Sequence, residues 1–387
     1  MAPTFEPFRI EVSDDVLDDL HDRLARARLS DAIPGAGWDY GTDRDYLAEL
    51  IAYWRDEYDW RRAEARINAF DQYLTEIDGA RIHFLHARSP EPDALPLLLV
   101  HGWPGSIVEF LDIIRPLSDP RAHGGDAADA FHVVCAAIPG YGFSGPTRDR
   151  GWTPRRVANA FSTLMAGLGY ERYTVQGGDW GSAIATQMGL HDAEHVAGIH
   201  LNLVMVPLPR DLDREQLTDL ERVALDARAR YSRDDSGYAK IQGTRPQTIG
   251  YALDDSPVGL AAWIVEKFRV WSDCDGDVEK SFTKDQLLDN VMLYWLTGTA
   301  HSAGRLYYEA QQAGRGLDAG ARVEVPTGVA DFPREIVRTP REWAEPYYNV
   351  VHWSEMPRGG HFAAMEAGAL LVDDVRACFR PLRVARE

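Results

Sequence analysis

The sequence predicts an α/β protein with a mostly parallel, doubly wound sheet, a helical insertion in that sheet and a helical segment before it. From about residue 95, short aliphatic or β-branched runs alternate with longer helical patterns, as in parallel strands joined by right-handed helical crossovers. From about Pro207 to Gly316 the pattern is helical and aromatic instead. Strand patterns then resume, so we expect the insertion to form a lid on one large sheet.

The expected elements begin with a Trp-rich helical segment from about residue 5 to residue 72. Residues Tyr73–Arg88 alternate around Asp78-Gly79, which favours a β-hairpin. A helix is expected over Thr153–Leu168. The expected strands of the sheet are Leu95–Val100, Phe131–Ile138, Arg172–Gln176, Val196–Leu203, Arg322–Pro326 and Asn349–Glu355.

These patterns divide the chain into four consecutive parts. Residues 1–90 are expected to form an N-terminal segment whose end includes the hairpin, and residues 91–206 form the first part of the core. Residues 207–316 are the expected lid, and residues 317–387 complete the core. Internal repeats are not evident.

The composition excludes several classes of function. The chain has 41 Lys and Arg residues against 60 Asp and Glu residues, and its net charge of −19 repels nucleic acid and anionic membrane surfaces. Cys135, Cys274 and Cys378 have no spacing typical of a disulfide framework or a metal site. The N-terminus lacks a signal-peptide pattern, and no run of about 18 apolar residues occurs. We therefore expect a soluble, cytoplasmic protein without a metal ion, nucleic-acid partner or membrane attachment.

The sharpest chemical motif is Val175-Gln176-Gly177-Gly178-Asp179-Trp180-Gly181-Ser182, in which a strand enters a tight, glycine-flanked turn that opens a helix. This arrangement is typical of a nucleophile elbow, and a helix N-terminus favours a carboxylate. Because the central residue is Asp179 and not a serine, the expected reaction is displacement at a saturated carbon, followed by hydrolysis of the resulting ester. The alternative is a turn in which Asp179 merely caps the helix.

A second glycine-rich turn, His101-Gly102-Trp103-Pro104-Gly105-Ser106, directly follows the apolar run Leu97–Val100. It is expected at the carboxyl edge of a strand, where the active sites of such sheets lie. The backbone N–H groups of Trp103 and Trp180 are expected to form an oxyanion hole there, and one such donor contributes about a hundred- to a thousand-fold in rate. A turn in which Pro104 simply starts a helix is also compatible with the pattern.

A histidine that activates water is expected at His361, in the motif Arg358-Gly359-Gly360-His361-Phe362. Of the 12 histidines, it alone combines a Gly-Gly approach with a position after a strand. Two carboxylates, Asp331 and Glu335, follow the preceding strand, and the pattern does not decide which of them orients the histidine. The alternative for Glu335 is a charge in the first turn of a helix after Pro333.

Together these motifs resemble the microsomal and juvenile-hormone type of epoxide hydrolase, with its soluble bacterial and fungal relatives, over nearly the whole chain. That family has the α/β-hydrolase fold, and its N-terminal domain, which wraps around the core and lid, is similar to Gly37–Thr42 and Tyr53–Arg61 here. The resemblance implies that Asp179 is the nucleophile and His361 the base. It also implies that Glu335 is the acid, through a Phe-Pro-x-Glu pattern.

The resemblance further implies two lid tyrosines that hydrogen-bond the epoxide oxygen, Tyr238 and Tyr307, although the adjacent Tyr308 leaves the second choice open. A phenol with a pKa of about 10 stays protonated at neutral pH and supplies a proton to a departing alkoxide. The alternative is that these tyrosines only pack the lid against the core.

The implied substrate is a small-molecule epoxide, which is opened to a vicinal diol without a cofactor. Aromatic residues of the expected lid, Trp263, Phe268, Trp271 and Trp295, favour an apolar or aryl epoxide. Bacterial relatives act in catabolism and in antibiotic assembly, including that of enediynes, and the biosynthetic role is a hypothesis here. The sequence leaves a homodimer open.

Two other functions compete with this one. A haloalkane dehalogenase also attacks carbon with an aspartate and holds the halide with a following tryptophan, as Trp180 follows here, but it has no task for Tyr238 and Tyr307. A non-catalytic protein of the same fold would bind a ligand through its lid, and such proteins usually lack a catalytic residue. Halide release, or ligand binding without diol formation, would discriminate between these functions.

Overall fold

The computed structural model describes residues 3–210, 212–313 and 320–383. Within these ranges one nine-stranded sheet has the order β1-β2-β3-β5-β4-β6-β7-β8-β9. In this order, neighbours are antiparallel from β1 to β5 and parallel from β5 to β9. The predicted α/β class, with a mostly parallel sheet, is confirmed. The strands are β1 (Glu6–Phe8), β2 (Gln72–Ile77), β3 (Ala80–Ala87), β4 (Leu95–Val100), β5 (Phe131–Ala136), β6 (Tyr173–Gly177), β7 (Val196–Leu201), β8 (Val323–Asp331) and β9 (Tyr348–Glu355).

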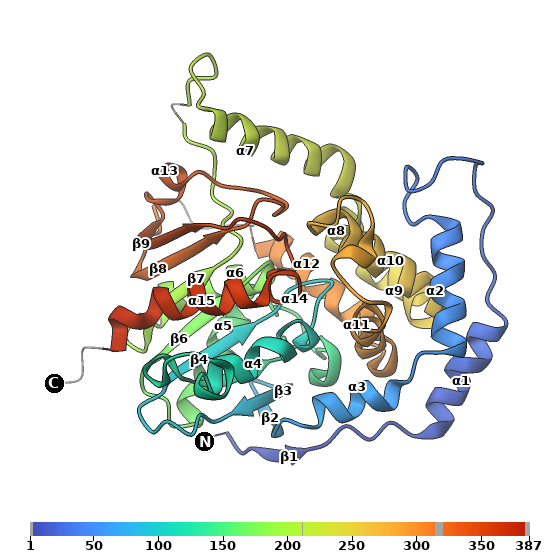
Figure 1. Ribbon diagram of the computed structural model, residues 1–387, viewed down its shortest axis with the longest axis horizontal. Coiled ribbons are helices and arrows are strands. Elements are labelled where there is room, and N and C mark those ends of the chain that lie inside the picture. The colour runs from blue at the N-terminus through green and yellow to red at the C-terminus, as the bar shows by residue number, and fades with distance from the viewer. Residues whose placement is uncertain (1–2, 211, 314–319, 384–387) are drawn as a thin grey trace.

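The strand sequences explain why the sheet is covered on both faces. All six residues of β4 are buried, as expected for a continuously apolar strand between two layers of helices. Figure 1 shows α4 and α15 on one side of the sheet and α5 and α6 on the other. These helices are α4 (Leu111–Ser118), α5 (Pro154–Gly167), α6 (Trp180–His191) and α15 (Gly368–Phe379). Because α6 packs on β4, β6 and β7, its first residue lies near the middle of the sheet.

Two strands differ from the prediction by more than two residues. β8 continues to Asp331, whereas the sequence predicts an end at Pro326. Register shifts beside Pro326 accommodate a residue that cannot donate to the ladder. β1 lies in the segment expected to be helical, yet it pairs with β2 at the edge of the sheet, because three residues are too few to show a strand period.

Between β7 and β8 the described chain is helical, as the sequence predicts. Its α-helices are α7 (Asp219–Arg230), α8 (Gly237–Thr244), α9 (Pro246–Asp255), α10 (Pro257–Trp271), α11 (Lys284–Thr297) and α12 (Ala300–Ala313). α12 packs against α8 and α9, and Figure 1 shows α8 to α12 gathered on one side of the sheet. The expected lid boundary at residues 316 and 317 lies outside the described residues, as do residues 1–2 and 384–387.

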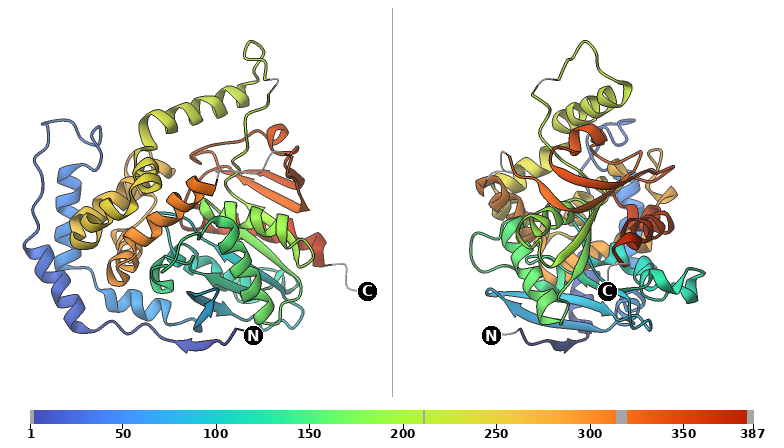
Figure 2. Two further views of the ribbon diagram at one scale, coloured as in Figure 1. Left: turned by 180° about the vertical axis from the view of Figure 1, so that it is seen from behind. Right: turned by 90° about the vertical axis from the view of Figure 1, so that its left-hand side faces the viewer.

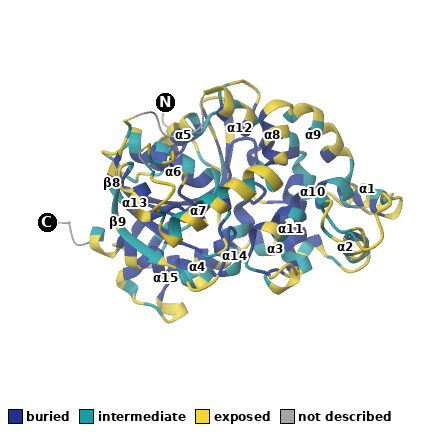
Figure 3. Cartoon of the chain, turned by 90° about the horizontal axis from the view of Figure 1, so that it is seen from above, coloured by how far each residue is buried: buried dark blue, intermediate teal, exposed yellow. Residues whose placement is uncertain are grey.

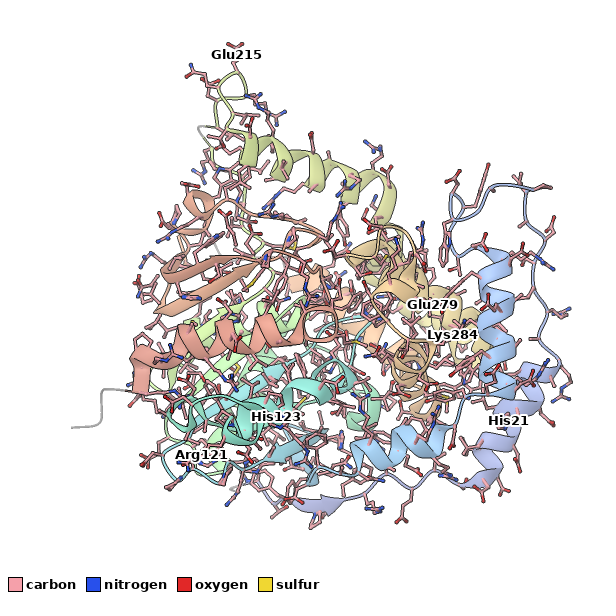
Figure 4. The ribbon with its side chains drawn as sticks, in the orientation of Figure 1. His21, Arg121, His123, Glu215, Glu279 and Lys284 are labelled. Atoms are coloured by element: carbon pink, nitrogen blue, oxygen red, sulfur yellow. The ribbon has the colours of Figure 1, made fainter. Side chains whose placement is uncertain are left out.

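The N-terminal segment runs along the outer side of the lid, as Figure 2 shows. Its helices are α1 (Asp14–Ala25), α2 (Arg44–Asp56) and α3 (Trp60–Ile67). Ion pairs cross the border: Arg23 Nη1 lies 3.1 Å from Asp255 Oδ1, and Lys284 Nζ lies 2.7 Å from Glu49 Oε1. In Figure 4 Lys284 and Glu279 lie side by side at this border. Exposed ion pairs contribute about 0 to 1 kcal/mol each, so the buried apolar face of α2 supplies most of the attachment.

Burial follows this layered arrangement. In Figure 3 the strands are largely buried, and exposed residues gather on the outer faces of α2 and α7. Among the helices in the described ranges, none has both the length and the apolar character needed to cross a bilayer. The remaining short helical elements are α13 (Arg341–Ala344), α14 (Ala363–Glu366), a π-helical turn at Tyr231–Asp235, and 3₁₀ turns at Ile107–Phe110, Arg121–His123, Ala127–Asp129, Gly142–Ser144, Val278–Lys280 and Arg380–Arg383.

Candidate active site

Asp179 lies in a sharp turn between β6 and α6. Its φ of 49° and ψ of −124° are strained for an L residue, at a cost of about 1 to 3 kcal/mol. The flanking glycines make the turn possible, because a Cβ at Gly177 would lie 2.3 Å from the carbonyl of Gly181, and a Cβ at Gly181 would lie 1.9 Å from the carbonyl oxygen of Val100. The Asp179 side chain makes no capping hydrogen bond to α6, so the structure does not support the capping alternative.

The turn after β4 holds the carboxylate of Asp179. The backbone N–H of Trp103 donates to Asp179 Oδ1 at 2.8 Å. Gly102 permits this approach, because a Cβ there would lie 2.3 Å from Asp179 Cβ. Trp180 is the first residue of α6, so its N–H belongs to the helix end that favours negative charge. The structure thus brings both expected oxyanion residues to the nucleophile.

His361 follows a glycine pair and faces Asp179. Its Nε2 lies 3.5 Å from Asp179 Oδ2, and its Nδ1 lies 2.6 Å from Glu335 Oε1. A Cβ at Gly360 would lie 2.6 Å from the carbonyl oxygen of Trp271, which accepts the His361 N–H at 2.9 Å. Burial lowers the pKa of His361, but the charge of Glu335 and the contact with Asp179 outweigh this effect and hold the pKa well above its ordinary value.

The two carboxylates that the sequence left undecided have different partners. Glu335 is buried against His361. Asp331 ends β8 and pairs with Arg338, whose Nε donates to Asp331 Oδ1 at 2.9 Å. Of the two, Glu335 therefore contacts the imidazole. The chain around Glu335 is an irregular turn, which does not support the alternative of a charge in the first turn of a helix.

Tyr238 on α8 and Tyr307 on α12 lie over the two tryptophans of the oxyanion turns. The Tyr238 ring stacks on Trp103 with centroids 4.6 Å apart, and the Tyr307 ring meets Trp180 edge-on at 4.7 Å. The two phenol rings are 5.7 Å apart. Burial, together with the nearby charge of Asp179, raises the pKa of both tyrosines well above 10, so both are protonated at neutral pH.

The hydroxyl groups of these tyrosines have different surroundings. The Tyr238 hydroxyl lies 3.0 Å from that of Tyr231. The Tyr307 hydroxyl is buried without a hydrogen-bond partner among the described residues, which is costly unless a bound molecule supplies the partner. Tyr308 is 36% exposed against 4% for Tyr307. The structure therefore places Tyr307, and not its neighbour, beside the other site residues.

Two of the lid aromatic residues expected at the substrate lie elsewhere. Phe268 has no exposed surface, and its ring stacks on Phe362 at 3.9 Å. Trp295 faces α1, where the guanidinium of Arg23 lies 5.7 Å from its ring. The pattern of a lid helix does not tell which of its faces meets the core, so the sequence could not separate packing residues from lining residues.

Other aromatic rings surround the nucleophile. Trp271 lies edge-on to His361 at 5.0 Å. Trp103, expected to act through its backbone alone, also contributes its ring, which lies 6.2 Å from that of Trp271. Trp263 is half-buried, and its indole N–H donates to Gln242 of α8 at 3.1 Å. The walls of the site thus include Trp103 and Trp180 of the core turns and Trp271 of α10, whereas the contact of Trp263 is with α8.

The sequence did not point to Glu109, which lies in the 3₁₀ turn Ile107–Phe110. Glu109 lines a small cavity together with Asp179 and His361. Burial raises the pKa of Glu109 to about 8. Its place in a Ser-x-x-Glu pattern is typical of an ordinary helix cap, which is why the sequence indicated no other role.

This arrangement suits two-step displacement chemistry. A carboxylate held by a backbone N–H attacks carbon, and an adjacent histidine–carboxylate pair activates water to hydrolyse the ester.

The fold and the elbow define an α/β-hydrolase, and residues 96–236 match the family model described as alpha/beta hydrolase fold. Residues 5–110 match the model described as Epoxide hydrolase N terminus. With the relatives below, these matches show that the chain belongs to the epoxide hydrolase family, as the resemblance implied.

The relatives cover nearly the whole chain. A "Putative epoxide hydrolase" of Stigmatella aurantiaca is 48% identical over 97% of this chain and 85% of its own length. "Epoxide hydrolase 1" of Sus scrofa is 41% identical over 96% of this chain and 88% of its own length. The structure of the Aspergillus niger epoxide hydrolase has a TM-score of 0.88 and 32% identity, and the alignment covers 98% of this chain and 97% of that one. The shared fold and family identify this chain as a hydrolase.

Proposed function

We propose that the chain converts an apolar or aryl epoxide and water to a vicinal diol through an ester on Asp179. In this proposal Tyr238 and Tyr307 supply the proton for ring opening, and His361 with Glu335 activates water. Membership of the epoxide hydrolase family supports the reaction. The single observation that carries the residue assignment is the contact of one imidazole with Asp179 on one side and Glu335 on the other.

In the first step Asp179 attacks an epoxide carbon. The N–H of Trp103 holds Oδ1, so Oδ2 is the oxygen that forms the new carbon–oxygen bond. The ring carbon–oxygen bond breaks, and Tyr238 or Tyr307 transfers its proton to the departing oxygen. Acid assistance of this kind contributes about a hundred- to ten-thousand-fold in rate. The product of this step is a hydroxyalkyl ester and a tyrosinate.

In the second step His361 activates water. Ester formation removes the charge of Asp179, one of the two charges that raise the pKa of His361, so His361 releases its proton to solvent and becomes a neutral base. His361 takes a proton from water, hydroxide adds to the ester carbonyl, and Trp103 and Trp180 stabilise the oxyanion. The diol leaves with the proton of His361. The regenerated acid of Asp179 then yields its proton to restore the tyrosine. His361 takes a proton back from solvent when the charge of Asp179 is restored.

A single turnover in water enriched in heavy oxygen tests this order of bonds. With enzyme in excess over styrene oxide, the new diol oxygen comes from Asp179, so the first diol carries no label. The peptide that contains Asp179 gains the heavy oxygen instead. A labelled diol and an unlabelled peptide after one turnover would mean that water attacks the epoxide directly.

The alternatives are not favoured. A halide needs a hydrogen-bond donor and not proton transfer, so a dehalogenase leaves two buried, protonated phenols without a task. A non-catalytic binding protein has no use for the His361 pair beside a strained Asp179. Assays of halide release and of ligand binding without turnover check both alternatives on the same preparation.

We also propose a cytoplasmic location, a division of the chain into four parts and a role in antibiotic assembly. The cytoplasmic location is supported by Cys135, Cys274 and Cys378, which are buried free thiols as in a reducing compartment. The four-part division of the chain is supported by the helical run between β7 and β8. The role in antibiotic assembly is supported by the tryptophan-walled site, which suits aryl groups. This last proposal is dropped if the purified enzyme turns over aliphatic epoxides and ignores styrene-type oxides.

A further inference from the structure

A small cavity lies beside the nucleophile. Its lining includes Asp179, His361, Glu109, Gln176 and Asn202. About 10 Å³ of it is open to the centre of a water molecule, which is room for a single water. The cavity therefore suits the hydrolytic water and is too small for the epoxide.

The side chain of Gln176 shows that this cavity is polar. Its Nε2 donates to Asn202 Oδ1 at 3.0 Å, whereas its Oε1 is buried without a hydrogen-bond partner among the described residues. Buried acceptors of this kind are ordinarily satisfied by protein groups or by ordered water. The cavity thus has the polar walls that a bound water requires.

The structure assigns a positioning role to Glu109: its carboxyl group holds the water that hydrolyses the Asp179 ester. This inference rests on the proposed function. The 3₁₀ turn that carries Glu109 follows the same loop that holds Asp179. Two glycines of that loop make room for the two carboxyl groups: a Cβ at Gly105 would lie 1.4 Å from Glu109 Oε1, and a Cβ at Gly102 would lie 2.3 Å from Asp179 Oδ1.

The charge state of Glu109 fits this role. Burial raises its pKa to about 8, with His361 acting in the opposite direction and the charges of Asp179 and Glu335 acting in the same one. At neutral pH the carboxyl group is therefore mostly uncharged. Its carbonyl oxygen accepts one hydrogen of the water while His361 Nε2 accepts the other, which directs a water lone pair to the ester carbon. In the free enzyme, a neutral Glu109 also avoids a further negative charge beside Asp179 and Glu335.

Glu109 also contributes to the structure of its own turn, which is a role separate from holding the water. Ser106 caps the 3₁₀ turn by accepting from the N–H of Val108, and the N–H of Ser106 donates to the Glu109 carboxyl group. Loss of a cap alone would lower the stability of the turn. It would also disturb the Trp103 N–H that holds Asp179, and so would slow ester formation as well as hydrolysis.

Rapid-quench mass spectrometry with styrene oxide measures the two steps separately. We expect Glu109→Leu to form the ester at the parent rate and to hydrolyse it about a hundred-fold more slowly, the size of effect expected for a misplaced reactant. Glu109→Gln retains the carbonyl acceptor, so its ester should decay within about ten-fold of the parent rate. Glu221→Leu, which removes the capping-box glutamate of α7, should leave both rates unchanged.

Each contrary outcome has a defined meaning. An ester lifetime in Glu109→Leu equal to that of the parent overturns the inference. Equal slowing of both steps, with a lower Tm, assigns Glu109 to capping and also overturns it. Decay in Glu109→Gln as slow as in Glu109→Leu overturns the role of a neutral acceptor. If no ester forms even in His361→Gln, the proposed function fails and not only the role of Glu109.

Discussion

The two ring nitrogens of His361 contact two carboxylates with different fates. Glu335 keeps its charge through the proposed cycle, whereas Asp179 loses its charge when the ester forms. Because both charges raise the pKa of His361 in the free enzyme, that pKa must fall in the ester. The bond between Asp179 and the substrate therefore lowers the pKa of His361, so that the neutral imidazole is present when the ester has to be hydrolysed.

Replacing Glu335 tests its contact with His361. Glu335→Gln should lower kcat by about a thousand- to ten-thousand-fold, because the imidazole loses the group that fixes its tautomer and stabilises its charge. Asp331→Asn is the matched control, since Asp331 pairs with Arg338 and not with His361. Steady-state hydrolysis of styrene oxide measures both. A larger loss of kcat in the Asp331→Asn variant would mean that Asp331, and not Glu335, is the acid.

Replacing the lid tyrosines tests proton supply. Tyr238→Phe and Tyr307→Phe should each slow ester formation by about a hundred- to ten-thousand-fold, whereas Tyr308→Phe should not, because Tyr308 points out of the site. Since burial raises the pKa of both phenols well above 10, the parent's rate of ester formation should not fall as the pH rises to 10. A decline through pH 9 to 10 in the parent, absent from both Phe variants, would contradict the raised pKa. Ester formation at the parent rate in either Phe variant would contradict proton supply by that tyrosine.

The motifs predict Asp179 and His361 because Asp179 lies between glycines and His361 follows a pair of glycines, and such glycines are typical of a turn in which the backbone is tightly packed. The pattern could not choose between Asp331 and Glu335, since four residues of irregular chain decide which side chain turns toward the imidazole. The sequence did not indicate a role for Glu109, because its Ser-x-x-Glu pattern is the same whether the glutamate only caps a helix or also faces the active site.

At the scale of elements, a carboxylate ties the C-terminal helix to two strands. Asp374 of α15 lies 2.8 Å from His200 Nε2 of β7 and 2.7 Å from His352 Nε2 of β9. Burial alone would raise the pKa of Asp374, but the bonds from both histidines lower it below its ordinary value. This cluster holds β9, an edge strand of the sheet, against the helix that covers it.

The sign of its pH dependence follows from the lowered pKa. A folded-state pKa below the unfolded value of about 3.9 means that ionised Asp374 stabilises the fold above about pH 4, and that this contribution is lost as the pH falls further. Asp374→Asn should lower the free energy of unfolding by about 3 to 5 kcal/mol at pH 7, and the deficit should narrow below pH 4. Asp373→Asn, which removes an exposed carboxylate that pairs with Arg376, should cost about 0 to 1 kcal/mol. Equal unfolding curves for the two variants in urea would contradict the cluster's role.

The strands of the core were predictable because buried parallel strands are continuous apolar runs bounded by turns. β1 was not, since its pairing with β2 depends on where the N-terminal segment lies in space. The end of β8 was misplaced because Pro326 ordinarily ends a ladder, and the register shift that tolerates it has no local signature.

At the scale of the whole molecule, the site is assembled from three distant parts of the chain. The first part of the core supplies Asp179, the second supplies Glu335 and His361, and the lid supplies both tyrosines. They meet because parallel strands present their carboxyl ends at one edge of the sheet, and the lid is inserted at that edge. The order of elements predicts this meeting place, whereas which faces of the lid helices line it depends on tertiary packing.

The most direct test of an ester on Asp179 is the mass of a His361→Gln variant mixed with excess styrene oxide. We expect the variant to form the ester but not to hydrolyse it. The intact protein should then gain the mass of one substrate, and the gain should map to the peptide that contains Asp179. A folded variant that gains no mass, although the parent converts the same epoxide to diol, would contradict an ester on Asp179.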